Sequence, residues 1–501
     1  MENRVKEKVD YILKVSEASS RDYDEVKQEM INLKKGMGIT FREFYNNELW
    51  LKTPTQQNIR ARYILRDRER KNQNFEKIKA ALGLEKSEVR ERIREINQKG
   101  IYFMNLAYYG NFEVYRYSEE ELDDVLHLFA RRKALKASLD EKLMAIDDGI
   151  LSYDALTEEV TELYAITEKL MPKSMEEMLI EKITISRPDL KSDPKKLHDV
   201  VIDMNVTWYW LGFTYPEYVS FHFVDKTIAE KHAFISDRER MKVIKTINDE
   251  GQFDLLDDKS KTYSVLKKYY GRKMLKITSN RDYRKFKWFC FGKKTIVVKP
   301  FFDSMGRGIK PIPLQEEKTI REAFKELRKD YRQFIVEDLI TAHEDIKRLN
   351  PDSVNTVRVI TYFDGEKSII HSTFMKVGKA GSFVDNGGAG GIFVCIDPET
   401  GIMTTSGCDE NGVRYETHPD TGVKFEGYQL PNWEDLRKLG LKLSTKLPGI
   451  SYIGWDMTCT KKGKWIIVEG NGKTQFFGQQ CTTGVGKRQD FFDTVHYKPG
   501  K

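Results

Sequence analysis

Residues 452–472 read YIGWDMTCTKKGKWIIVEGNG, in which two apolar runs are separated by the polar stretch 461–464. Glycine within that short connection permits a tight reversal, so the segment is predicted to be a β-hairpin. Because side chains alternate between the two faces of a strand, the register of the hairpin decides which polar groups meet.

The hairpin is predicted to bring two carboxylates together. A turn centred on Lys462 and Gly463 places Asp456 opposite Glu469, with Cβ atoms about 4.5–5.5 Å apart. Asn471 follows Glu469 by two residues and returns to the same face. Two carboxylates and an amide oxygen suit Mg²⁺, which prefers hard oxygen ligands. The alternative is a solvated hairpin with ordinary surface acids, but its apolar neighbours make unpaired carboxylates costly.

The chain around this hairpin carries β-strand patterns from residue 292 onward. Asp364-Gly365 separates two of these runs and is typical of a hairpin turn. The expected strands are 295–299, 334–340, 356–363, 368–377, 392–396, 452–460 and 465–469. Helices are expected at 317–327 and 433–447. This order predicts an α+β region with largely antiparallel sheets.

The first 200 or so residues show helical spacing of apolar residues among many lysines and glutamates. The clearest helical segments are 23–34, 74–97 and 119–143. We interpret residues 1–200 as a helical domain, which could be a solvated cap or a module that docks a partner or a second copy. Residues 201–290 are expected to be a connector that starts with the aromatic-rich stretch 204–223, and residues 291–495 the β-rich domain.

Length and composition fit a globular protein of two or three domains. The chain has 501 residues, of which 40% are hydrophobic and 32% charged. A net charge of +7 from 84 basic and 77 acidic residues supports at most an acidic substrate or a membrane-surface preference. Neither a basic stripe nor a named module points to nucleic acid.

The cysteines and the N-terminus favour a cytoplasmic protein. The five cysteines are scattered and never spaced as CxxC, so free thiols are expected rather than disulfides or zinc. The N-terminus lacks a signal-peptide pattern. No apolar run approaches the roughly 18 residues of a transmembrane segment.

Further candidate binding residues lie upstream of the hairpin. Lys299 ends a β run and is followed by Gly306 and Gly308, a pattern in which a lysine and backbone N–H groups can contact phosphates. The GxxxxGK[ST] spacing of a P-loop is absent. The apolar run 334–340 could offer backbone groups to an adenine edge, or be a plain core strand.

Two basic residues and a second glycine segment follow. Arg358 lies on a half-buried strand face and needs a partner, which could be a structural carboxylate or a phosphate. Lys376 ends the next strand, and Asn386 belongs to the glycine-rich segment 385–391. Each could be an ordinary loop or strand feature, but their order along the chain argues against coincidence.

This order of motifs resembles the ATP-grasp superfamily and, more closely, the sugar-transfer associated ATP-grasp family. The resemblance covers roughly residues 200–490. At superfamily level it is carried by Asp257–Lys259, the strand 297–300, the Glu337 strand and the closing hairpin. The narrower family is indicated by 355–358, 385–391 followed by IFVCIDPETG, His418-Pro419 and Leu430-Pro431-Asn432-Trp433. His418 itself is interpreted as a turn residue.

The resemblance implies an ATP-grasp fold of two α/β subdomains that clasp ATP and Mg²⁺, preceded by the helical region. It assigns the phosphates to Lys259 and Lys299, and a mobile lid to Gly306 and Gly308. It assigns the adenine and ribose sides to Glu337, Asp338, Leu339 and Glu344, with Asn386 also at the cofactor. It assigns magnesium to Asp456, Glu469 and Asn471, and the transferring phosphate to Arg358 and Lys376.

One position departs from the superfamily pattern. Some members that ligate amino acids carry an arginine two residues before the first metal carboxylate, and this chain has Gly454 there. The residue that positions the acyl group is therefore unassigned, with Arg307 and Lys487 as candidates.

The implied activity is that of an ATP-dependent carboxylate–amine ligase acting through an acylphosphate. Its substrates would be an amino acid or amine and a uronic-acid-type sugar of a surface polysaccharide. One alternative is a sugar or carboxylate kinase that uses the same ATP site. Another is a non-catalytic docking subunit, in which bound ATP only orders a partner.

Overall fold

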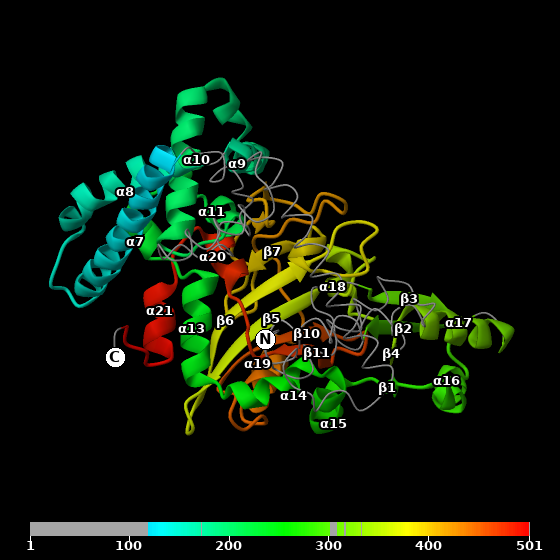
Figure 1. Ribbon diagram of the computed structural model, residues 1–501. Coiled ribbons are helices and arrows are strands. Elements are labelled where there is room, and N and C mark those ends of the chain that lie inside the picture. The colour runs from blue at the N-terminus through cyan, green and yellow to red at the C-terminus, as the bar shows by residue number, and fades with distance from the viewer. Residues whose placement is uncertain (1–118, 172, 301–307, 315–316, 332, 500–501) are drawn as a thin grey trace, which may run out of the picture. The chain divides into compact units, whose positions relative to one another are not determined.

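The protein is described by a computed structural model that covers residues 119–499 except 172, 301–307, 315–316 and 332 (Figure 1). The chain divides into two compact units, whose described parts are 119–215 and 216–498. The helices predicted at 23–34 and 74–97 lie outside the described residues. Among the residues described, no helix combines the length and the apolar character needed to cross a membrane.

The first unit is helical in its described part. Its helices are α7 (Glu119–Asp147), α8 (Thr157–Leu170), α9 (Lys173–Ser186) and α10 (Pro194–Tyr209). Leu135, Leu139 and Leu143 recur every four residues along α7 and are buried, which gives that helix one apolar stripe. The helix predicted at 119–143 is confirmed by α7.

The second unit begins with short helices. They are α11 (Tyr215–Ser220), α12 (Ile228–His232), α13 (Asp237–Ile247), α14 (Phe253–Asp257) and α15 (Lys259–Tyr270). The aromatic-rich stretch predicted as a connector is helical over much of its length. In this unit Phe221 and Phe234 are buried and stack with ring centroids 5.2 Å apart. Burial explains the density of aromatic residues there.

A four-stranded antiparallel sheet follows, in the order β1-β4-β2-β3. Its strands are β1 (Met274–Ile277), β2 (Thr295–Pro300), β3 (Lys310–Pro313) and β4 (Phe334–Asp338). Helices α16 (Tyr283–Cys290) and α17 (Glu317–Asp330) pack on this sheet (Figure 1). Their shared core includes Phe286, whose ring lies 5.2 Å from Phe324 and 6.2 Å from Phe334.

A seven-stranded antiparallel sheet has the order β11-β10-β5-β6-β7-β8-β9. Its strands are β5 (Thr356–Phe363), β6 (Ser368–Val377), β7 (Ile392–Cys395), β8 (Gly407–Cys408), β9 (Arg414–Tyr415), β10 (Tyr452–Cys459) and β11 (Trp465–Asn471). The accompanying helices are α18 (Glu344–Leu349), α19 (Trp433–Ser444), α20 (Phe477–Thr483) and α21 (Arg488–Thr494).

The alternation of side chains divides this sheet into an apolar face and a charged face. Val357, Val359 and Met457 belong to the core that also contains α19. Arg358 and Asp456 are their neighbours in sequence and are directly paired across β5 and β10, so they point to the opposite face. The predicted α+β architecture with antiparallel sheets is confirmed.

Four sheet strands were not predicted, namely β1, β3 and the two-residue strands β8 and β9. β1 has only four residues and precedes the region where the β pattern was recognised. β3 reads KPIP, and its two prolines cannot donate ladder hydrogen bonds. β3 lies at an edge of the sheet, which is where such a strand is tolerated.

The closing hairpin has the predicted pairing for a partly different reason. Asp456 is opposite Glu469, as predicted. However, the pair nearest the turn is Cys459 and Trp465, which puts the centre of the turn half a residue earlier than predicted. A β-bulge at Val468 then shifts the register by one residue and brings the two carboxylates together.

The glycine after α15 is a point where the fold constrains the residue type. Gly271 has φ +60°, and a Cβ atom there would lie 2.4 Å from Cγ2 of Ile466. Gly292 has a similar φ of +73°, but a Cβ atom there would have nothing within 4 Å.

Gly292→Ala should cost about 1–2 kcal/mol of stability for the left-handed backbone. Gly271→Ala should cost about 1–3 kcal/mol more, because the core is overpacked. Urea unfolding of both variants measures the difference, and equal losses would contradict the close approach.

Candidate active site

A cleft lies where residues of both sheets converge. It encloses about 670 Å³ of empty space, part of it open to solvent. Its described charged lining consists of Lys259, Lys299, Lys376, Glu337, Asp338, Asp385, Asp456 and Glu469. Most of the charged residues singled out in the sequence therefore meet in one place.

The described lining carries more carboxylates than ammonium groups, five against three. Three of these carboxylates also have a basic partner outside the lining, because Arg272 contacts Glu337, Lys293 contacts Asp338 and Arg358 contacts Asp456. The cleft therefore holds basic groups for a polyphosphate and carboxylates for a divalent cation.

Asp456 is buried on β10 and is held by two cations. Its carboxylate accepts hydrogen bonds from Arg358 Nε at 2.6 Å and Nη2 at 3.1 Å, and Lys376 Nζ lies 3.0 Å away. Burial alone would raise the pKa of Asp456, but the charges of Arg358 and Lys376 outweigh it and hold the pKa at about 2. Asp456 is therefore a permanent anion at neutral pH.

Glu469 and Asn471 share the face of the hairpin that carries Asp456. Glu469 is more open, with 37% of its side chain exposed, and its carboxylate lies 3.2 Å from Lys259 Nζ. Asn471 Nδ2 lies 3.5 Å from Asp456 Oδ2. A half-turn of the Asn471 amide would present its oxygen instead.

These three groups fit a magnesium ion that is completed from outside the protein. Among the described residues, no group of three or more His, Cys, Asp or Glu could hold a metal by itself. Two carboxylates and one amide oxygen suit Mg²⁺, which usually keeps water and takes phosphate oxygens as further ligands. An all-protein cage is not needed.

A second buried ion cluster joins Lys299, Glu337 and Arg272. Glu337 Oε2 lies 3.0 Å from Lys299 Nζ and accepts a 2.9 Å hydrogen bond from Arg272 Nε. Burial would raise the pKa of Glu337, but Arg272 and Lys299 outweigh it and hold the pKa at about 2. Burial lowers the pKa of Lys299 despite its partner Glu337. The other oxygen of Glu337, Oε1, is buried without a hydrogen-bond partner.

Arg272 also holds the bulge in the hairpin formed by β10 and β11. Its Nη1 donates to the carbonyl of Ile467 at 2.6 Å, and its Nη2 donates to the carbonyl of Val468 at 3.1 Å. Val468 is the bulge residue next to Glu469. One guanidinium therefore links the carboxylate beside Lys299 to the backbone that orients Glu469.

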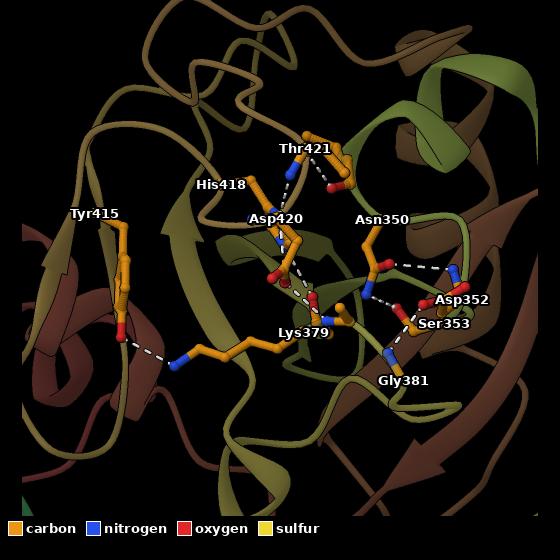
Figure 2. Close-up of polar contacts among 12 residues, drawn as sticks. Asn350, Asp352, Ser353, Lys379, Gly381, Tyr415, His418, Asp420 and Thr421 are labelled. Atoms are coloured by element: carbon orange, nitrogen blue, oxygen red, sulfur yellow. Dashed lines mark hydrogen bonds and ion pairs between the residues drawn. The ribbon is translucent and has the colours of Figure 1, made fainter.

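Asp385 and Asn386 reach the cleft from the β6–β7 loop, which is held at several points (Figure 2). His418 Nε2 lies 2.8 Å from the Gly378 carbonyl, and its Nδ1 accepts hydrogen bonds from the backbone N–H groups of Asp420 and Thr421. These contacts show His418 in a turn. The same loop is tied by two further bonds, Ala380 N–H to Asp420 and Gly381 N–H to Asp352.

Some residues singled out in the sequence are not brought to the cleft. Leu339 is 41% exposed, the Glu344 side chain is 68% exposed beside Lys347, and neither belongs to the lining. Lys487 lies 3.6 Å from Asp490 and is also outside the lining. Gly308 is exposed with φ +69°.

Three further residues singled out in the sequence are Gly306, Arg307 and Asp338. Gly306 and Arg307 lie outside the described residues. Asp338 does line the cleft, where it is paired with Lys293 at 2.7 Å.

The space above Gly454 is occupied by another side chain. A Cβ atom at this position would lie 2.0 Å from Thr474 Oγ1 and 2.9 Å from Arg358 Cδ. Thr474 Oγ1 in turn accepts a 3.0 Å hydrogen bond from Arg358 Nη1. An arginine at 454 has no room here, and the guanidinium beside Asp456 comes from the neighbouring strand instead.

Three residues of this site were not assigned roles from the sequence. Asp385 opens the glycine-rich segment and could have been noticed as an acid beside flexible backbone. Arg272 and Thr474 lie in unremarkable stretches, and no local pattern identifies them. Their contacts connect residues about 65 to 200 positions apart.

The two antiparallel sheets and the charged cleft at their junction define an ATP-grasp fold. The sugar-transfer associated ATP-grasp family model matches residues 238–491, and the chain belongs to this family. No curated protein sequence matches the chain.

Similar solved structures include three ligases. The ATP-grasp ligase PsnB in complex with a minimal precursor is 12% identical, with a TM-score of 0.31 over 50% of this chain and 62% of that one. D-alanyl-alanine synthetase A from Vibrio cholerae is 15% identical, with a TM-score of 0.30 over 49% and 66%. VanG D-Ala:D-Ser ligase from Enterococcus faecalis is 12% identical, with a TM-score of 0.34 over 50% and 63%. The chain spans less than two thirds of each of these structures.

The free energy of unfolding should fall at acid pH, because buried carboxylates such as Glu337 then become protonated. Glu337 has a folded-state pKa of about 2, below its ordinary value of about 4.3. Its contribution is therefore complete above pH of about 5 and is lost as the pH falls toward 2. Glu337→Gln should lower stability at neutral pH by about 3–5 kcal/mol, because it leaves buried cations unpaired. It should also flatten the decline in unfolding free energy between about pH 5 and pH 2.

Urea unfolding followed by tryptophan fluorescence across this pH range measures both effects. Glu366→Gln, at an exposed position in the β5–β6 turn, is the matched control. Equal pH slopes for the native protein and Glu337→Gln would contradict the assignment of a depressed pKa.

Proposed function

We propose that this protein is an ATP-dependent ligase that joins a carboxylate to an amine through an acylphosphate. The observation that carries the proposal is the meeting of Asp456 and Glu469 across the hairpin, inside a cleft that also contains Lys259 and Lys299. Phosphoryl transfer depends mainly on positioning and charge neutralisation, so a protein nucleophile is not required. Membership of the ATP-grasp family supports the same chemistry.

In the proposed first step, an oxygen of the substrate carboxylate attacks the γ-phosphorus of ATP. The bond from phosphorus to the β,γ-bridging oxygen breaks, and ADP leaves. Asp456, Glu469 and Asn471 would hold Mg²⁺, which would supply positive charge to the phosphate oxygens. Arg358 and Lys376 are proposed to stabilise the transferring phosphoryl group, because both already lie against Asp456.

The nucleotide is proposed to bind through residues on both sheets. Lys259 and Lys299 would neutralise the phosphates, each exchanging part of its present contact with Glu469 or Glu337. The unpartnered Oε1 of Glu337 could accept a hydrogen bond from the adenine amino group. Asp338 and Asn386 line the same cleft and are proposed to complete the cofactor site.

In the proposed second step, the amine attacks the acyl carbon and phosphate leaves. The amine must lose a proton, and Asp385 is a suitable acceptor. Its pKa is raised by burial and by Asp456, despite the opposing charge of Lys376. A raised pKa makes it a better base than Asp456 at neutral pH.

The proposed substrates are a uronic-acid-type sugar carboxylate and an amino acid or amine. The support is the family's association with sugar transfer, and we propose that the sugar belongs to a glycan of the cell surface. Such a reaction would use ATP in the cytoplasm during polysaccharide biosynthesis. The helical first unit is proposed as a site for a partner or a second copy.

The metal and phosphate contacts can be tested by ATP turnover. Asp456→Ala and Glu469→Ala should each lower ADP release by about a hundredfold or more, because each removes a carboxylate proposed to hold the Mg²⁺ that stabilises the transition state. Glu366→Ala should turn over at the native rate. ADP release that is unchanged in both cleft variants would remove the metal assignment, and absence of ADP release from the native protein itself would favour a docking subunit.

The reaction type can be tested by its products. With uronic acids and amino acids as substrates, ADP should appear together with an amide. Hydroxylamine in place of the amine should trap the acylphosphate as a hydroxamate. A stable phosphate ester with no hydroxamate would identify a kinase instead.

A further inference from the structure

Helix α16 carries two large aromatic side chains that point away from the protein core. Trp288 is 76% exposed and Phe291, just after the helix, is 84% exposed. They are the most exposed large hydrophobic residues in the described part of the chain. The core contacts of this helix are made by Phe286, Phe289 and Cys290. Packing against the four-stranded sheet therefore does not account for Trp288 and Phe291.

The same segment concentrates the positive charge of the protein. Residues 271–294 contain nine lysines and arginines and one aspartate, a formal charge of +8 against +7 for the whole chain. Exposed members of this set are Lys273, Lys276, Arg281, Arg284, Lys285, Lys287 and Lys294. The charge of the protein is thus localised rather than spread evenly.

The aromatic and basic groups belong to one surface. Lys273 directly precedes β1, and its Nζ lies 5.9 Å from the ring centroid of Trp288 on α16. Two acids reduce the charge only in part: Asp282 lies 3.6 Å from Lys285, and Asp338 lies 2.7 Å from Lys293. We call the surface formed by Trp288, Phe291 and the exposed basic residues of 271–294 the α16 patch.

We propose that the α16 patch docks on a membrane surface that contains anionic phospholipid. Tryptophan and phenylalanine side chains that project from a helix can enter the boundary between headgroups and acyl chains. Lysines and arginines around them are attracted to anionic headgroups. The patch presents both requirements together, on one short helix and the residues beside it.

Single-stranded nucleic acid is the main competing partner for a basic surface with aromatic residues. Such partners usually bind in a basic groove, with bases stacked on aromatic side chains that line it. Here the aromatic side chains project into solvent, with exposed fractions of 76% and 84%. Phe291 offers only apolar surface. This arrangement favours insertion into lipid.

The patch belongs to the four-stranded sheet that also carries Lys299 and Glu337 in the cleft. Docking would hold this sheet at the membrane. The residues that contact the membrane would be different from those that line the cleft. The inference concerns lipid binding alone, so it does not depend on the ligase proposal. A failure of one can therefore be distinguished from a failure of the other.

Flotation of the full chain with vesicles tests the proposal without ATP. The protein should float with equimolar phosphatidylcholine–phosphatidylglycerol vesicles and not with pure phosphatidylcholine. Combined Trp288→Ala and Phe291→Ala should weaken the partition by about tenfold, because apolar insertion is lost. Lys273→Glu, Arg284→Glu and Lys294→Glu together should weaken it by at least about a hundredfold.

A matched control separates the patch from overall charge. Lys461→Glu, Lys462→Glu and Lys464→Glu change net charge equally, at exposed positions in the β10–β11 turn, and should retain most of the binding. All variants should keep native thermal unfolding and native ATP turnover.

Several results would overturn the proposal. These are no binding to anionic vesicles, equal binding to neutral vesicles, or equal losses in the two charge-reversal variants. Loss of RNA binding rather than vesicle binding in the aromatic variant would assign the patch to nucleic acid. A change from dimer to monomer in that variant, measured by analytical ultracentrifugation, would assign it to self-association.

Discussion

The buried contact between Arg272 and Glu337 is the interaction on which the site depends. Taking both charges out of water is costly, and only good geometry with further hydrogen bonds offsets that cost. Arg272 provides them by donating also to the carbonyls of Ile467 and Val468. The sheet that carries Lys299 and the hairpin that carries Glu469 are therefore joined by one guanidinium. The proposed phosphate and metal contacts therefore belong to one hydrogen-bonded arrangement.

The charged groups of the cleft are already paired with one another before any ligand binds. Asp456 is held by Arg358 and Lys376, and Glu469 lies against Lys259. An incoming metal–phosphate complex would bring both a cation for the carboxylates and anions for the basic groups. The exchange of partners can leave the total number of charge contacts nearly constant. Groups that are already oriented need little reorganisation when charge moves during reaction.

The sequence allowed the hairpin and most strands to be predicted, because alternation and turn residues are local signals. The pairing of Asp456 with Glu469 was predicted from the turn alone, yet it depends on a bulge at Val468. That bulge is stabilised by Arg272, almost 200 residues away. Glu344 shows the opposite case, since its motif spacing is right but its side chain faces solvent. Long-range contacts decide these details, and a single sequence does not display them.

Net charge is a poor guide to surface chemistry in this chain. The segment 271–294 carries +8, which leaves a formal charge of −1 on all other residues together. Charge screening restricts such a field to roughly 8–10 Å from the surface at physiological salt. A weak overall charge could therefore not attract the protein to an anionic surface, whereas a local cluster can. Because Trp288 and Phe291 are exposed within that segment, electrostatic attraction and apolar insertion would act at the same contact and reinforce one another.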